Sequence, residues 1–82
     1  MNLFLSAKTE RKQIEALNRC RLPELSHLVA LFKELEDETL RSLAKADDSA
    51  RIYRLQGRAE ALTDFLEAVE QAASVLERAR KP

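Results

Sequence analysis

An unbroken apolar repeat runs through the C-terminal part of the chain. Its members are spaced alternately three and four residues apart: Ile52, Leu55, Ala59, Leu62, Leu66, Val69, Ala73 and Leu76. An α-helix has about 3.6 residues per turn, so this spacing places all of these side chains on one face. A repeat averaging about 3.5 residues also favours left-handed winding against a partner helix. This main stripe predicts a helix over residues 50–80 that packs along its length against another element.

A second apolar stripe lies beside the main stripe in the C-terminal half of the same predicted helix. Its members again alternate four and three residues apart: Ala61, Phe65, Ala68, Ala72, Val75 and Ala79. The equivalent positions nearer the N-terminus of this helix hold Arg51, Arg54 and Arg58. Together the two stripes are wider than one partner helix can cover. We therefore predict that the second stripe is a protein interface, either with the chain's own first segment or with another molecule.

The middle of the chain supplies a partner for the main stripe. Residues 47–49 are Asp-Asp-Ser, whose side chains cap helix N-termini, and Pro23 favours the first position of a helix. Between these two signals the apolar residues are Leu25, Leu28, Phe32 and Leu35, after which the pattern shifts to Leu40 and Leu43. A short turn between two helices makes them antiparallel neighbours. We therefore predict a long helical hairpin, coiled-coil-like, formed by residues 24–46 and 50–80.

The first 22 residues form a separate basic segment. They carry five Lys or Arg and two Asp or Glu, a net charge of +3. Ile14 and Leu17 share one face and predict a shorter amphipathic helix between about Ser6 and Arg21. The predicted fold class is therefore all-α, with the hairpin preceded by a shorter helix. With 82 residues the chain has material for one domain, 1–82, divided into the basic segment 1–22 and the hairpin 23–82.

Charge is distributed unevenly along a chain that is neutral as a whole, with 14 basic and 14 acidic residues. Residues 23–48 carry three basic and seven acidic groups, a net of −4, and residues 49–82 carry six and five, a net of +1. Antiparallel pairing places the acidic run, Glu34, Glu36, Asp37 and Glu38, opposite Arg54 and Arg58. We therefore predict charge complementarity between the two hairpin helices.

The composition offers little material for catalysis or metal binding. The chain has one His, one Cys and one Gly, which leaves no Cys/His cluster for zinc and no glycine-rich loop for phosphate. The predicted inward positions are apolar, so no carboxylate pair is held inside the fold. We therefore predict that the protein is not an enzyme and takes no cofactor, metal or small-molecule substrate.

The sequence also lacks membrane and export signals. No apolar run approaches the roughly 20 residues of a membrane-spanning helix, and the N-terminus has no basic region followed by an apolar core. We expect the protein in the cytoplasm, or within a virion assembled there, without a membrane partner.

Four residues on the outer side of the predicted last helix form a candidate polar contact: Tyr53, Arg54, Gly57 and Arg58. A glycine inside a helix costs about 1 kcal/mol relative to alanine, so Gly57 can mark a place where another chain or a phosphate approaches the backbone. With Arg51 and the basic N-terminal segment, this site supports one alternative function, a small nucleic-acid-binding regulator.

The stretch from Ser49 to Leu62, SARIYRLQGRAEAL, with its continuation to Leu76, resembles small helical-hairpin proteins among the virion and assembly proteins of tailed bacteriophages. The resemblance covers about a third of the chain and carries over no site residue. It implies a minor structural or assembly component of a phage particle that packs against a larger protein. The leading prediction is therefore a non-enzymatic structural or adaptor protein that self-associates or docks on a larger protein. A second alternative is an inhibitor that docks on a host protein.

Overall fold

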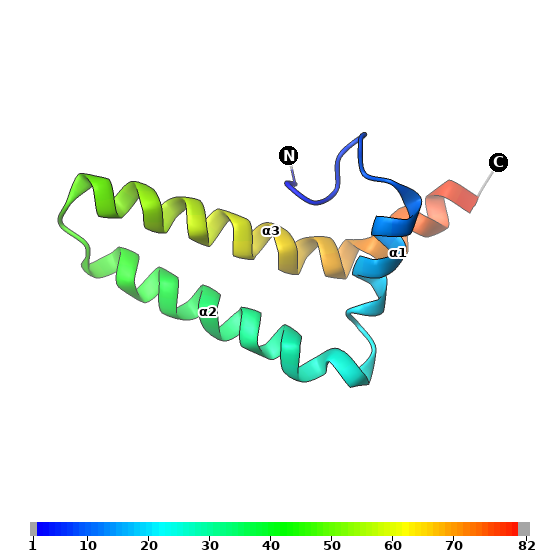
Figure 1. Ribbon diagram of the computed structural model, residues 1–82, viewed down its shortest axis with the longest axis horizontal. Coiled ribbons are helices and arrows are strands. Elements are labelled where there is room, and N and C mark those ends of the chain that lie inside the picture. The colour runs from blue at the N-terminus through cyan, green and yellow to red at the C-terminus, as the bar shows by residue number, and fades with distance from the viewer. Residues whose placement is uncertain (1, 81–82) are drawn as a thin grey trace.

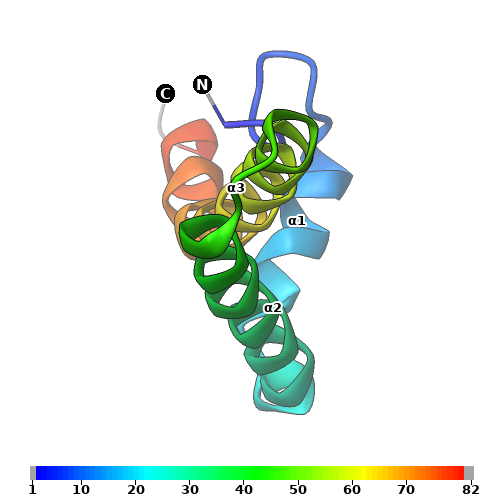
Figure 2. The ribbon, with the colours of Figure 1, turned by 90° about the vertical axis from the view of Figure 1, so that its left-hand side faces the viewer.

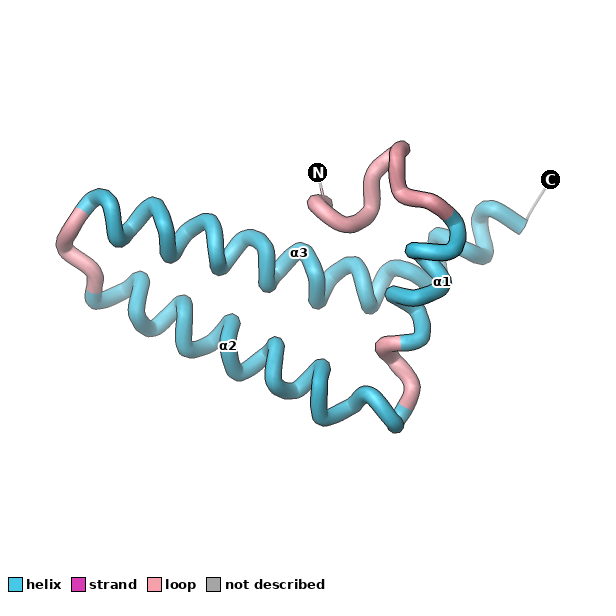
Figure 3. Tube along the Cα trace, in the orientation of Figure 1, coloured by secondary structure: helices cyan, strands magenta, loops and turns pink. Residues whose placement is uncertain are grey.

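The computed structural model describes residues 2–80, and the side chains of residues 2–78. Its helices are α1 (Arg11–Arg19), the short 3-10 helix η1 (Pro23–Leu25), α2 (Ser26–Lys45) and α3 (Ser49–Arg80). Helices α2 and α3 lie side by side in opposite directions, and α1 packs across the C-terminal half of α3 (Figures 1 and 2). Residues 2–80 contain no strand, and the remaining segments are loops and turns (Figure 3). The prediction of an all-α hairpin preceded by a shorter helix is confirmed.

Local chain chemistry sets where the hairpin helices begin. The Asp48 carboxylate accepts a hydrogen bond from the Arg51 N–H at 3.3 Å, and the Asp48 carbonyl accepts one from the Ile52 N–H at 2.9 Å. Asp48 therefore caps α3, as the polar turn predicts. Pro23 occupies the first position of η1, where its missing N–H leaves no hydrogen bond unmade.

Replacing Asp48 with alanine should lower the free energy of unfolding by about 1 kcal/mol, because the N-terminus of α3 loses the acceptor for one of its free N–H groups. Asp47→Ala is the matched control, since its carboxylate accepts no hydrogen bond from the described residues and the change should stay within about 0.5 kcal/mol. Urea denaturation followed by circular dichroism measures both. Equal losses for the two variants would show that Asp48 is not the cap.

Helix α1 begins later than predicted. The Thr9 side chain bonds to the backbone that precedes it: its hydroxyl donates to the Phe4 carbonyl at 3.0 Å and accepts from the Ser6 N–H at 3.0 Å. Serine and threonine compete with helix formation through bonds of this kind, so the predicted start near Ser6 is wrong. Helix α1 begins at Arg11. The backbone N–H of Glu10, the residue before it, donates a hydrogen bond to the Gln13 side chain at 2.9 Å.

The main stripe of α3 faces inward, as predicted. Leu55, Ala59, Val69 and Leu76 are buried, and the other members are half-buried. The facing line on α2 differs from the predicted one. It consists of buried and half-buried residues spaced alternately four and three apart: Leu25, Val29, Phe32, Glu36, Thr39 and Leu43.

Thr39 explains the difference on α2. Its hydroxyl donates to the Leu35 carbonyl at 2.7 Å, so the side chain is buried without an unsatisfied polar group. Leu40, predicted to take this inward place, is exposed instead. The predicted shift of register in α2 is therefore wrong, and Leu28 and Leu35 lie at an exposed edge of the hairpin.

The chain is more extended than a compact domain of its length. The radius of gyration is 14.9 Å, against about 12 Å for a compact chain of this size. The solvent-accessible surface is 6472 Å², whereas a compact monomer of this mass exposes about 5,000 Å². In the described chain every buried apolar residue belongs to α3. Helices α1 and α2 thus pack on α3 along one side each and leave much of their own surface in solvent.

Candidate functional site

The second stripe of α3 is an interface within the chain. Ala68 and Ala72 are completely buried, and Ala61, Phe65 and Val75 are half-buried, where α1 and the N-terminal segment pack on α3. Ala79 belongs to α3, but its side chain lies outside the described residues. The small alanine side chains let α1 approach α3 closely. Of the two partners that the sequence leaves open for this stripe, the chain's own first segment packs on this part of α3. Contact of the stripe with another molecule stays a prediction.

Phe65 joins three parts of the chain. Its ring lies 5.6 Å from the Phe4 ring in an edge-to-face arrangement and 4.6 Å from the Phe32 ring, measured between ring centroids. Next to it, the Asp64 carbonyl accepts a hydrogen bond from the Asn2 amide at 2.9 Å, and the Asp64 carboxylate accepts one from the Leu3 N–H at 2.8 Å. The N-terminal segment is thus fastened to the middle of α3.

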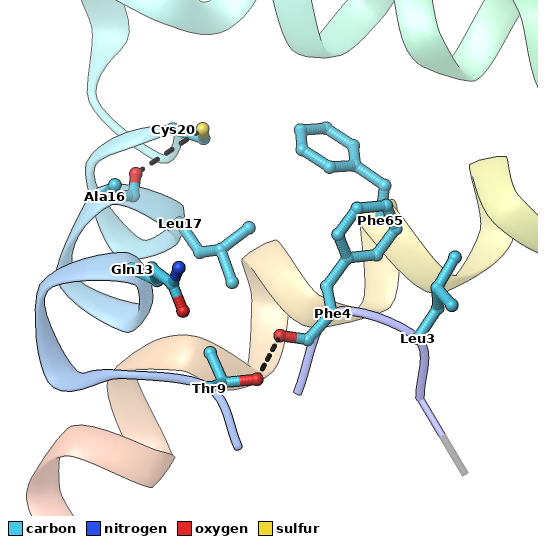
Figure 4. Close-up of a pocket in the computed structure, with 8 residues that line it drawn as sticks. All are labelled: Leu3, Phe4, Thr9, Gln13, Ala16, Leu17, Cys20 and Phe65. Atoms are coloured by element: carbon cyan, nitrogen blue, oxygen red, sulfur yellow. Dashed lines mark hydrogen bonds between the residues drawn. The ribbon is translucent and has the colours of Figure 1, made fainter. Parts of the chain in front are cut away.

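An apolar groove of about 520 Å³ remains between the N-terminal segment, α1 and α3 (Figure 4). Its lining residues are Leu3, Phe4, Thr9, Gln13, Ala16, Leu17, Cys20 and Phe65. The Cys20 thiol donates to the Ala16 carbonyl at 3.6 Å, and the Thr9 hydroxyl is bonded to the Phe4 carbonyl. Among the described residues no charged group lines the groove, which offers space for apolar groups.

A row of exposed leucines lies on α2. Leu28, Leu31 and Leu35 are three and four residues apart on one helix face, and each is between 40% and 49% exposed. We call them the leucine row. Three acidic residues stand one helical turn from its members: Glu24, Glu34 and Glu38. An exposed leucine alone is ordinary, but three on one face of a helix form a candidate contact surface.

The sequence already contained a signal for this row. Apolar residues of α2 occupy an arc wider than one line of contact, because Leu28 and Leu31 stand beside Leu25, Val29 and Phe32. A single apolar line on α2 predicts that Leu28 and Leu35 belong to the hairpin contact and gives Leu31 no role.

Three arginines gather at the turn end of the hairpin. Arg51, Arg54 and Arg58 line one open hollow of about 320 Å³ together with Ser42 and Leu55. A smaller adjoining hollow shares Ser42 and Arg51 and is lined also by Lys45, Ala46 and Asp47. We call the larger one the arginine hollow.

The predicted pairing of these arginines with the acidic run is not formed. Among the residues whose side chains are described, one ion pair is present, between Arg11 and Glu15 at 3.2 Å. Glu36 instead accepts a hydrogen bond from the Thr63 hydroxyl at 2.5 Å. The positive charge of the arginine hollow is therefore not neutralised by direct contact with a carboxylate.

The candidate polar contact residues lie together on the outer side of α3. Tyr53 is 73% exposed, and apart from the adjoining residues and backbone of its own helix no described atom stands within 4 Å of the place where a side chain at Gly57 would begin. Tyr53 and Gly57, Gly57 and Arg54, and Arg54 and Arg58 are helix-surface neighbours by their spacing. The structure therefore joins an exposed aromatic ring, bare backbone and the arginine hollow in one surface.

The described residues provide neither a metal site nor a membrane-spanning helix. No group of three or more His, Cys, Asp and Glu side chains there is arranged to hold a metal ion. No described helix combines the length and apolar character needed to cross a membrane.

Comparisons with known proteins find no family model, curated protein or solved structure that matches the chain. Function is therefore inferred from the leucine row and the arginine hollow.

Proposed function

We propose that the protein is a non-enzymatic structural or adaptor protein that acts by helix packing, with the leucine row as its docking surface for a helix of a different protein. The exposed leucines of this row and the large total accessible surface of the chain support this proposal. The accessible surface of 6472 Å² exceeds that of a compact monomer by about 1,500 Å². A standard protein–protein interface buries about 800 Å² on each partner, so the excess is large enough for one.

The charges beside the leucine row favour a basic partner over a second copy. In a two-fold antiparallel pair centred on Leu31, facing residue numbers sum to 62, so Glu24 would oppose Glu38 of the second copy. Like charges that face each other across packed helices destabilise the pair. A partner helix whose apolar stripe is bordered by Lys or Arg would instead place positive charges opposite Glu24, Glu34 and Glu38, and opposite charges attract. A place in a phage particle, implied by the resemblance of residues 49–76, stays a prediction.

A designed peptide tests the docking surface directly. The probe is a labelled amphipathic helix of about three heptads with leucines at alternate spacings of three and four and lysines beside them. Its counterpart carries glutamates in place of the lysines. Fluorescence anisotropy should show binding of the lysine peptide and none of the glutamate peptide. Leu31→Ala should weaken binding about tenfold, because it removes part of a side chain whose full burial contributes about 1.5–3 kcal/mol.

Leu40 provides a matched control. It is 47% exposed, close to Leu31, and stands nine residues further along α2, which places it on the opposite side of the helix. Leu40→Ala should leave peptide binding unchanged. Equal weakening by the two variants, or no binding of the lysine peptide, would refute the leucine row as a docking surface. Light scattering adds a separate check, because a fixed multiple of 9.4 kDa would show self-association instead.

A further inference from the structure

We propose that the turn end of the hairpin binds single-stranded nucleic acid, with the arginine hollow holding phosphate groups and Tyr53 stacking on a base. This site is separate from the leucine row, and it adds a ligand class to a protein proposed above to bind a helix. The inference rests on the charge of the hollow, its surroundings and the exposed ring beside it.

The arginines of the hollow are positioned to hold phosphate groups. Arg51, Arg54 and Arg58 follow one another at spacings of three and four, so they extend over about 10 Å of helix. All three line the same open space, and Ser42 adds a hydroxyl from α2. Guanidinium groups bind phosphate through paired N–H donors, and three such groups around one hollow suit a chain of phosphates.

No carboxylate of the described residues lines the hollow. Asp48 is bonded to the Arg51 N–H as the cap of α3, and Asp47 lines only the adjoining space. Glu36, from the acidic run, is bonded to Thr63. Lys45 in the adjoining space adds a further positive charge at the same end of the hairpin. An incoming phosphate therefore meets arginines without displacing an ion pair.

Tyr53 and Gly57 favour a nucleic acid over a free anion. A phosphate ion does not stack on an exposed aromatic ring, whereas every nucleic-acid base can stack on one. Tyr53 is 73% exposed, and the open backbone at Gly57 lies between it and the arginines on the helix surface. A strand can therefore pass from the hollow across Gly57 to the ring.

The charge around the hollow favours a single strand over a duplex. A duplex presents about one charge per 1.7 Å over a broad surface. It would also approach the acidic segment 23–48, whose net charge is −4. A single strand follows a narrow basic track and exposes its bases for stacking, which matches the short site on α3.

A fluorescein-labelled oligothymidylate of about 12 nucleotides is the probe, because single-strand sites typically span about 4–16 nucleotides. Fluorescence anisotropy with the full chain should show binding at low salt. With three phosphates neutralised, the logarithm of the association constant should fall with the logarithm of salt concentration with a slope of about −2. Affinity should therefore drop about 20-fold between about 50 and 200 mM salt.

Arg54→Gln should weaken binding and make the salt slope less steep by about 0.7, because one phosphate contact is lost. Arg78→Gln is the matched control, an exposed arginine on the same helix outside the hollow. Tyr53→Ala should weaken binding about tenfold, and Tyr53→Phe should retain wild-type affinity because the ring remains. All three positions are surface sites, and circular dichroism checks that each of the four variants stays helical.

Several results would overturn the proposal. They are an absence of binding at about 50 mM salt, an equal loss from Arg78→Gln and Arg54→Gln, and equal affinity for a duplex of the same length. Complete displacement of the oligonucleotide by inorganic phosphate at the same phosphate concentration would show a free-anion site instead. Leu31→Ala should leave oligonucleotide binding unchanged, so failure of this site and failure of the leucine row can be told apart.

Discussion

Ala72→Asp is expected to lower the free energy of unfolding by about 3 kcal/mol or more. Ala72 is completely buried where α1 packs on α3. A carboxyl group there has no room and no partner, so it either stays buried without hydrogen bonds or forces α1 away. A domain of 82 residues has a total stability of about 4–12 kcal/mol. The expected loss is therefore a large fraction of the whole.

Ala44→Asp is the matched control for this prediction. Ala44 is an exposed alanine in the last turn of α2, and the same change there should cost only about 1 kcal/mol, from the lower helix propensity of Asp and its charge near the helix C-terminus. Urea denaturation followed by far-ultraviolet circular dichroism compares the two variants with the unaltered chain. If Ala72→Asp were as stable as Ala44→Asp, α1 would not cover the second stripe. That stripe would then be open to a partner, as the sequence alone allowed.

Phe65→Ala should cost about 3 kcal/mol. The substitution removes a large side chain that packs against Phe4 on one side and Phe32 on the other. Each aromatic pair contributes about 0.5–1.5 kcal/mol beyond its buried area, and the space left between three chain segments cannot close completely. The N-terminal segment should also lose order, because Phe4 loses its aromatic partner on α3. Urea denaturation measures the loss of stability.

Tyr53→Ala is the control for Phe65→Ala, because it removes an aromatic ring that is not packed between chain segments. Tyr53 lies on the same helix but is 73% exposed, so its replacement should change stability by no more than about 0.5 kcal/mol. A double-mutant cycle of Phe65→Ala with Phe4→Ala should give a coupling energy of about 0.5–1.5 kcal/mol. Additive effects of these two changes would contradict the contact between the rings.

The parts of the fold that were predictable are those with a strong local or periodic cause. The main stripe repeats for 25 residues, from Ile52 to Leu76, and such a repeat fits a helix far better than any other structure. The Asp48 cap and Pro23 act on their own backbone neighbours, so they indicate the helix starts without knowledge of the rest of the chain. Antiparallel pairing follows from the shortness of the turn between the helices.

The parts that were missed depend on polar side chains that choose among several partners. The Thr39 side chain lies inward with its hydroxyl bonded to the Leu35 carbonyl. A pattern of apolar residues gives no information about such a bond. The acidic run lies on the helix opposite Arg54, but an exposed ion pair contributes only about 0–1 kcal/mol and does not fix side-chain positions. Glu36 finds Thr63 instead.

The arrangement of α1 and the candidate sites lay beyond the sequence for different reasons. The second stripe can pack against an apolar helix face of the same chain or of another molecule. The apolar pattern does not distinguish these two partners. The sequence singles out these arginines as a candidate contact, which stays a prediction, but their grouping around Ser42 depends on the register between α2 and α3. The leucine row emerged only when the inward line of α2 was known.

The concentration of buried apolar residues in α3 also bears on how such a chain can evolve. Leu55, Ala59, Ala68, Val69, Ala72 and Leu76 are the buried apolar side chains of the described chain. Substitutions on the outer faces of α1 and α2 exchange one exposed side chain for another and have small effects on stability. Selection can therefore change the surface of these two helices, and with it the choice of partner, while a few positions of α3 preserve the fold.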